Sequence, residues 1–138
     1  MNEKMMKIKN IIVVFCIIAI AALFYSCKDT GVNTDNNTIP SSNVSYSKHI
    51  RPVLEAHCVG CHSSSNPQGG FDASTYSSLT ADPGIVFKGK PENSRIIWRV
   101  DPKYGMSVMP PLGSNYKALN SNQVTGLYTW IKEGANNN

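Results

Sequence analysis

Five consecutive residues, Cys58-Val59-Gly60-Cys61-His62, combine two thiols and an imidazole at a spacing that is typical of covalent haem attachment. Two cysteines three positions apart on one helical turn can each form a thioether with a vinyl group of the same porphyrin. The next imidazole can bind the iron, since histidine is one of the few side chains that hold haem iron. The motif therefore predicts one covalently bound haem c, attached through Cys58 and Cys61, with His62 as iron ligand.

Zinc knuckles and thioredoxin-like redox sites use the same C-x-x-C spacing and remain the alternatives. A structural zinc site needs four protein ligands, and only His49, His57 and His62 are available to complete one, two of them crowded against the cysteines. A redox pair is expected near a β-α-β pattern, which the sequence does not show. Both alternatives fit less well than haem.

A sixth iron ligand is expected from the segment Met106-Ser107-Val108-Met109-Pro110-Pro111. A methionine thioether can take that position. Met109 is favoured because two prolines follow it and fix backbone angles, which limits the motion of a residue that must stay at a set distance from a metal. Methionine is more often core filler, and Met106 and His49 are the other candidates for this ligand.

The haem motif is preceded by a predicted helix. Tyr46, Ile50, Val53 and Leu54 lie at i, i+4, i+7 and i+8, which is one face of a helix. Pro52 lies inside this stretch, so the helix either begins late, with Pro52 in its first turn, or is kinked there. Within the motif, a glycine between the two thiols would let the haem edge approach the backbone closely.

Residues 63–84 are rich in Ser, Asn, Pro and Gly and predict a loop, with a short helical turn near Thr75–Leu79. Its first part must supply an acceptor for the second ring nitrogen of His62, because a ligating imidazole normally donates that proton. Backbone near Asn66-Pro67 is the candidate.

A short helix follows, capped by Asn93 or Ser94 and ended by Asp101-Pro102. Its apolar side could cover one haem face while Arg95 or Arg99 meets a propionate. A core helix with solvated arginines is an equally good interpretation.

The clearest helix lies near the C-terminus. Asn120 with Gln123 forms a capping-box pattern, and Gly134 is placed to end the helix. Gly126 lowers helix stability, so we expect another helix, the one from Tyr46, to approach closely there.

Residues 1–26 have the form of a secretory signal, with basic residues followed by the 15-residue apolar run Ile11–Tyr25, which is shorter than the ~20 residues of a membrane-spanning helix. Cys27 follows a stretch that resembles a lipoprotein cleavage box, although its bulky residues leave plain cleavage or an uncleaved anchor as alternatives. Residues 27–45 are small and polar and predict a flexible tether. Residues 46–135 form the expected domain, and residues 136–138 are expected to fray.

Charge gives no indication of nucleic-acid binding. Removing residues 1–26 leaves ten basic and eight acidic side chains, scattered along the chain without a basic stripe. We therefore expect an exported domain, lipid-anchored to a membrane through Cys27 and located in the periplasm or on the cell surface.

In their order, these elements resemble the small class I-type cytochrome c domain, in particular its planctomycete and Bacteroidetes type. The matching stretches, IRPVLEAHCVGCH, GGFDASTYSSL, GKPENSRIIWRV, MPP and LNSNQVTGLYTWIKEGA, span Tyr46 to Ala135. The resemblance implies an all-α fold of three to four short helices wrapped around one haem, with long loops. It also implies thioethers at Cys58 and Cys61 and iron ligation by His62 and Met109.

The implied function is that of a mono-haem electron carrier and not of an enzyme. A monomeric domain with His62 and Met109 on the iron would pass single electrons between redox partner proteins. One alternative is an electron-input subunit of a dehydrogenase complex. A haem enzyme or gas sensor would need an open iron position, which Met109-Pro110-Pro111 argues against.

Overall fold

The computed structural model describes residues 38–138. The predicted signal segment 1–26, the predicted lipid site at Cys27 and the first part of the predicted tether lie outside the described residues.

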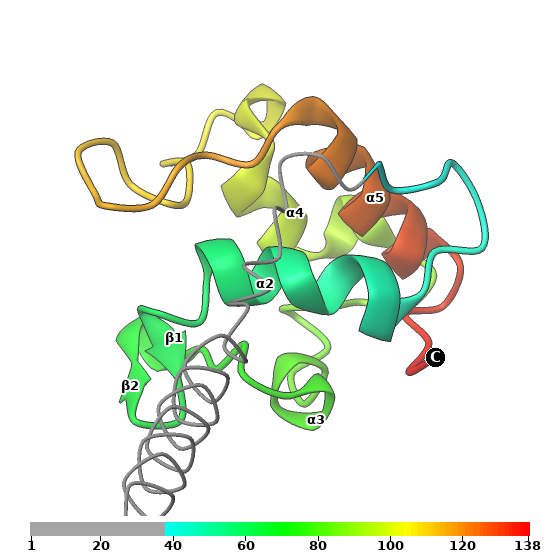
Figure 1. Cartoon of the computed structure of the whole chain (residues 1–138), viewed down its shortest axis with the longest axis horizontal. Coiled ribbons are helices and arrows are strands. Elements are labelled where there is room, and N and C mark those ends of the chain that lie inside the picture. Colours follow the sequence, from blue (N-terminus) through cyan, green and yellow to red (C-terminus); the bar gives the residue numbers. More distant parts are fainter. Residues whose placement is uncertain (1–37) are drawn as a thin grey trace, which may run out of the picture. The chain divides into compact units, whose positions relative to one another are not determined.

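Helices dominate the described part of the chain (Figure 1). It contains four short α-helices and one pair of two-residue strands, so the predicted helical class with three to four short helices and long loops is confirmed, whereas the small hairpin was not predicted. In chain order the elements are η1 (Tyr46–Ile50), α2 (Arg51–His57), β1 (His62–Ser63), β2 (Asn66–Pro67), η2 (Gln68–Gly70), α3 (Tyr76–Leu79), η3 (Pro91–Asn93), α4 (Arg95–Val100), η4 (Pro102–Tyr104) and α5 (Ser121–Lys132).

The first helical segment has two parts. A single π-helical turn, η1, leads into α2, and Pro52 lies in the first turn of α2. A proline is tolerated there because the N–H that it lacks would have no partner within the helix. Of the two predicted alternatives, the late start of the helix is therefore correct.

Helix α4 begins after Ser94 and ends before Asp101-Pro102, as predicted. The Ser94 side chain does not cap it. Instead, Ser94 Oγ accepts the N–H of Phe87 at 2.8 Å and donates to the carbonyl of Lys90 at 3.1 Å. Ser94 thus fastens the loop before α4 and leaves the helix start without a side-chain cap.

The predicted capping box of α5 is confirmed. Asn120 Oδ1 accepts the N–H of Gln123, and Gln123 Oε1 accepts the N–H of Asn120, both at 2.9 Å. Gly134 follows the helix with a φ of 104°, which favours glycine. Both ends of α5 are therefore where the sequence places them.

The hydrophobic core lies where η1, α2, α4 and α5 meet. Trp130 of α5 is fully buried, 5.7 Å from the ring centroid of Tyr46 and 6.5 Å from that of Tyr76. The principal core side chains are Ile39, Val44, Tyr46, Ile50, Val53, Leu54, Leu79, Val86, Ile96, Ile97, Val100, Leu127, Trp130 and Ile131.

The prediction of a flexible tether is wrong for residues 38–45. Ile39 and Val44 are buried in the core. Glu133 accepts the backbone N–H groups of Asn43 and Val44 at 2.7 and 2.9 Å. The polar composition of this stretch gave no sign that its two apolar residues pack on the domain. The Glu133 carboxylate provides acceptors for backbone N–H groups that would otherwise lack a partner.

The partner of Gly126 also differs from the prediction. A Cβ built on Gly126 would lie 2.6 to 3.0 Å from side-chain atoms of Ile39. Asn122 holds Ile39 in place, since its amide accepts the Ile39 N–H at 2.8 Å and donates to the Ile39 carbonyl at 3.0 Å. The close approach at Gly126 is therefore made by the N-terminal segment and not by the helix from Tyr46.

The predicted fraying of residues 136–138 is likewise wrong. The Asn138 carbonyl accepts the N–H of Ser47 at 2.8 Å, and Asn138 Oδ1 accepts the N–H of Tyr46 at 2.8 Å. Trp130 Nε1 donates to the Asn136 carbonyl at 3.0 Å. These bonds fasten the last residues to the start of η1 and to the core.

Candidate functional site

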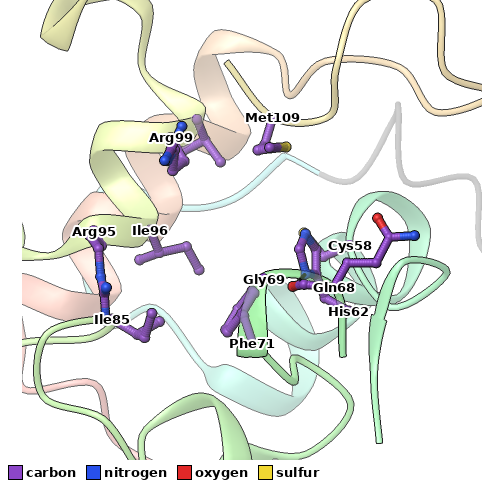
Figure 2. A pocket seen from close by; sticks show the side chains of 11 residues that line it. Cys58, His62, Gln68, Gly69, Phe71, Ile85, Arg95, Ile96, Arg99 and Met109 are labelled. Carbon is purple, nitrogen blue, oxygen red and sulfur yellow. Dashed lines mark hydrogen bonds between the residues drawn. The ribbon is translucent and has the colours of Figure 1, made fainter. Parts of the chain in front are cut away.

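A cavity with about 750 Å³ of empty space, part of it open to solvent, lies beside the C-x-x-C-H motif. His62 and Cys58 approach it from one side, while the residues of α4 and Met109 lie opposite (Figure 2). The lining residues are Cys58, His62, Gln68, Gly69, Phe71, Ile85, Arg95, Ile96, Arg99, Val100 and Met109.

His62 is held in place by its own hairpin. It lies on β1, which pairs with β2 so that His62 faces Pro67 across the ladder. His62 Nδ1 and the carbonyl oxygen of Gln68 are 2.9 Å apart. The predicted acceptor region near Asn66-Pro67 is therefore correct, but the accepting carbonyl belongs to the next residue, Gln68.

Phe71 supports the same imidazole and was missed in the sequence. Its ring centroid lies 5.0 Å from that of His62, with 51° between the planes. Gly69 and Gly70 precede it with φ values of 66° and 71°, a region that glycine enters without the strain of a side chain. The Gly-Gly pair thus turns the chain so that Phe71 reaches the histidine.

The two thiols have different surroundings. The Cys58 N–H donates to the Leu54 carbonyl at 2.8 Å and the His62 N–H to the Cys58 carbonyl at 2.9 Å, so the helical course of α2 continues into the motif. Cys58 lines the cavity, and burial raises the pKa of its thiol to about 12. Cys61 is half-buried and is not among the lining residues; neither thiol forms a disulfide.

The structure separates the candidates for the second ligand by location. Met109 lines the cavity, and its backbone N–H donates to the Arg99 carbonyl at the end of α4. Met106 does not line the cavity and is 40% exposed. His49 lies on η1, where Nδ1 accepts the N–H of Ser45 at 2.9 Å. Met109 is therefore the only one of the three that shares the cavity with His62.

The predicted role of α4 is met in part, because Ile96 and Val100 line the cavity together with both arginines. Arg95 is paired with Asp82 at 2.7 Å, and both side chains are about half exposed. Arg99 makes a long hydrogen bond of 3.4 Å to the Ser107 carbonyl. Within the described residues, Arg95 thus has a carboxylate partner, whereas the hydrogen bond of Arg99 is to a backbone carbonyl.

Gly60 contacts a side chain that the sequence did not suggest. A Cβ at this position would overlap Tyr116, whose hydroxyl lies over the glycine. Tyr116 comes from the loop that follows Met109 and contacts the glycine at which the sequence predicts the approach of the haem edge. Nothing in the sequence around Tyr116 indicated this contact.

The stretch that carries the motif and the methionine loop matches a known family. Residues 58–113 match the family model described as Planctomycete cytochrome C. The match supports a cytochrome c-type domain in this chain. The comparisons with curated proteins and with solved structures found no match. The matched residues include Cys58, Cys61, His62 and Met109, whereas all of α2 and all of α5 lie outside them.

Two further properties of the described residues concern membranes and metal ions. Residues 38–138 contain no helix that is both long and apolar enough to cross a membrane. The same residues hold no group of three or more His, Cys, Asp or Glu side chains placed to bind a metal ion among themselves.

Proposed function

We propose that this protein is a mono-haem c-type cytochrome that passes single electrons between redox partners outside the cytoplasm, with His62 and Met109 as the iron ligands. The observation that carries the proposal is that an imidazole and a thioether, from segments far apart in the sequence, line one cavity beside a C-x-x-C pair. This set of donors fits a haem c with two protein ligands.

Attachment would use the thiols of Cys58 and Cys61, each forming a thioether to the porphyrin. The bound haem supplies one-electron chemistry, since its iron exchanges a single electron with a partner. The protein's task is then to hold the group, orient its ligands and limit access of water.

His62 is prepared for ligation by the hydrogen bond to Gln68. Because a carbonyl can only accept, Nδ1 carries the ring proton, and Nε2 keeps the lone pair that a metal ligand needs. Phe71 restricts rotation of the ring from its other side. Together they give the ligand one tautomer and one orientation.

Met109 would be the second protein ligand of the iron and would leave no site for a substrate. A methionine ligand raises the reduction potential relative to a second histidine. The apolar side chains of Phe71, Ile85 and Ile96 line the same cavity and would limit the access of water to the haem, which disfavours the additional charge of the ferric state. Both effects suit an electron carrier of comparatively high potential.

Arg99 is the candidate partner for a haem propionate. It lines the cavity, whereas the guanidinium of Arg95 already binds Asp82. A charge-assisted hydrogen bond to a carboxylate is the interaction that arginine geometry favours.

Export and anchoring belong to the same proposal. The signal segment 1–26 would deliver the chain across the inner membrane, and a lipid on Cys27 would hold the domain at a membrane, in the periplasm or on the cell surface. Cytochrome c domains are typically extracytoplasmic, which supports this location. Redox partners would dock on a monomeric domain through small, weak interfaces.

An optical and redox titration of the purified soluble domain tests the proposal. We expect one covalently bound haem per chain, a six-coordinate spectrum in both oxidation states and a charge-transfer band from methionine to ferric iron. Binding of carbon monoxide to the reduced protein as fast as to a haem with an open position would contradict it and favour a gas sensor or an enzyme.

A further inference from the structure

His57 is a buried polar side chain for which the proposed chemistry has no use, although it directly precedes the haem motif. Its Nδ1 lies 2.8 Å from the carbonyl oxygen of Lys117, and its Nε2 lies 3.4 Å from Nε2 of Gln123. The carbonyl can only accept, so Nδ1 carries the proton and Nε2 is the acceptor. The Gln123 amide cannot reverse without cost, because its oxygen accepts the Asn120 N–H of the α5 capping box.

Tyr116, the residue before Lys117, makes the neighbouring contact. Its hydroxyl and ring edge lie over Gly60, where a Cβ would overlap them. Two consecutive residues of one loop are thus held in place. Tyr116 packs on the C-x-x-C-H motif, and Lys117 bonds the buried imidazole of His57 at the end of α2. Substitutions at Gly60 or Tyr116 and at His57 can therefore test the packing contact and the hydrogen bond separately.

The loop between Met109 and Tyr116 has little other support. Its near end is held by the hydrogen bond from the Met109 N–H to the Arg99 carbonyl. Residues 111–115 are exposed, and Leu112 among them is fully exposed. A segment with few buried contacts opens at a low free energy, so the attachment at its far end decides how freely Met109 can leave the cavity.

We infer that His57 and Tyr116 form a latch that keeps the Met109 loop closed over the haem site and so keeps the sixth coordination position filled. Both are positioning residues, since neither side chain lines the cavity. The inference rests on the proposed ligation by Met109. Releasing the latch increases the fraction of molecules in which Met109 is off the iron, and an external ligand then binds in proportion to that fraction.

The test measures the rate at which carbon monoxide binds to the reduced, haem-loaded protein. His57→Gln can keep an acceptor, its amide oxygen, near the position of Nε2 and loses the donor to Lys117, whereas His57→Asn keeps a donor near the position of Nδ1. We expect His57→Gln to raise the rate about tenfold, which corresponds to ~1.4 kcal/mol, and His57→Asn to restore most of the wild-type rate. Equal rates in the wild type and both variants would overturn the inference.

Tyr116 and Gly60 provide an independent arm in case a His57 variant does not fold. Gly60→Ala displaces Tyr116 without changing it, and the backbone at Gly60 is not in the left-handed region, so alanine can be accommodated. We expect faster carbon monoxide binding for Gly60→Ala and Tyr116→Ala and a smaller change for Tyr116→Phe, which keeps the ring. Wild-type rates in Gly60→Ala and Tyr116→Ala would count against the latch.

Two controls separate the possible failures. Val44→Ala removes core packing at the other end of α5 and should lower thermal stability without changing the carbon monoxide rate; an equal rise there would mean that general loosening, not the latch, sets the rate. Met109→Ala gives the rate for a fully open position. If the wild type lacks the methionine charge-transfer band, the proposed ligation fails; if the band is present and the latch variants bind carbon monoxide at the wild-type rate, only the latch fails.

Discussion

The carbonyl oxygen of Gln68 lies 2.9 Å from Nδ1 of His62, and this hydrogen bond fixes which ring nitrogen remains available to a metal. It spans six residues of a small hairpin whose register sets His62 against Pro67. Phe71, brought back by two glycines, packs against the same ring. A ligand for iron is thus oriented by backbone geometry and by one aromatic contact.

Substituting Phe71 tests that support. Phe71→Ala should lower the free energy of unfolding by ~1 to 3 kcal/mol, less than the ~3 to 5 of a fully buried phenylalanine, because Phe71 is only half-buried. It should also lower the reduction potential, since water would reach the haem and stabilise the ferric charge. Phe71→Leu, which keeps most of the apolar volume, is the matched control. Thermal unfolding and potentiometry would check both effects, and an unchanged potential in Phe71→Ala would exclude the proposed shielding.

Met109 and Met106 form a natural pair of variants. Met109→Ala should abolish the charge-transfer band and lower the reduction potential, because the thioether that stabilises the ferrous state would be lost. Met106→Ala should leave both unchanged, since its side chain lies outside the cavity. Optical spectra of the oxidised proteins measure the band, and potentiometry measures the reduction potential. If the band survives in Met109→Ala and disappears in Met106→Ala, the ligand assignment is reversed.

Helix positions and the capping box of α5 could be read from the sequence because their causes are local. Pro52, the Asn120 and Gln123 pair and Asp101-Pro102 each act within one helical turn. The same holds for the haem motif, whose chemistry depends on the spacing within five residues. Such features require no knowledge of the rest of the fold.

Contacts between distant segments could not be read in this way. Ile39 is an isolated apolar residue in a polar stretch, so composition predicted a tether, and its burial depends on Asn122 and Gly126 of α5. Tyr116 and Gly60 are likewise more than fifty positions apart. The sequence indicated that Gly126 needed a close neighbour, but only the packing of the whole domain determines which segment arrives there.

Asp101 makes a pH-dependent contribution to stability. The Lys103 side chain bonds the Asp101 carboxylate at 2.8 Å and lowers its pKa. A carboxyl whose pKa is lower in the folded state stabilises the fold above its unfolded pKa of ~3.9, and this stabilisation is lost as the pH falls through the folded pKa. Asp101→Asn should therefore be less stable than the wild type at pH 6, with a difference that shrinks below about pH 4. Urea titrations at both pH values check this, with Lys103→Met as the variant that should lose the same contribution; a difference independent of pH would contradict it.

The contact between Ile39 and Gly126 can be tested because it should reverse the usual effect of a glycine-to-alanine substitution on the free energy of unfolding. Replacing a helical glycine by alanine normally stabilises a helix by ~1 kcal/mol. Here the new methyl group would lie 2.6 to 3.0 Å from Ile39, which two hydrogen bonds to Asn122 hold in place. Overpacking of this kind costs ~1 to 3 kcal/mol. In the wild-type background, Gly126→Ala should therefore lower the free energy of unfolding.

In an Ile39→Ala background the obstacle is absent, and the same Gly126→Ala substitution should raise stability by up to ~1 kcal/mol. Chemical denaturation of the four proteins gives the coupling energy between the two positions. Ile39→Ala alone should destabilise the domain by ~2 to 4 kcal/mol, because the side chain is only 4% exposed. If Gly126→Ala has the same effect in both backgrounds, residues 38–45 do not pack on α5 in solution.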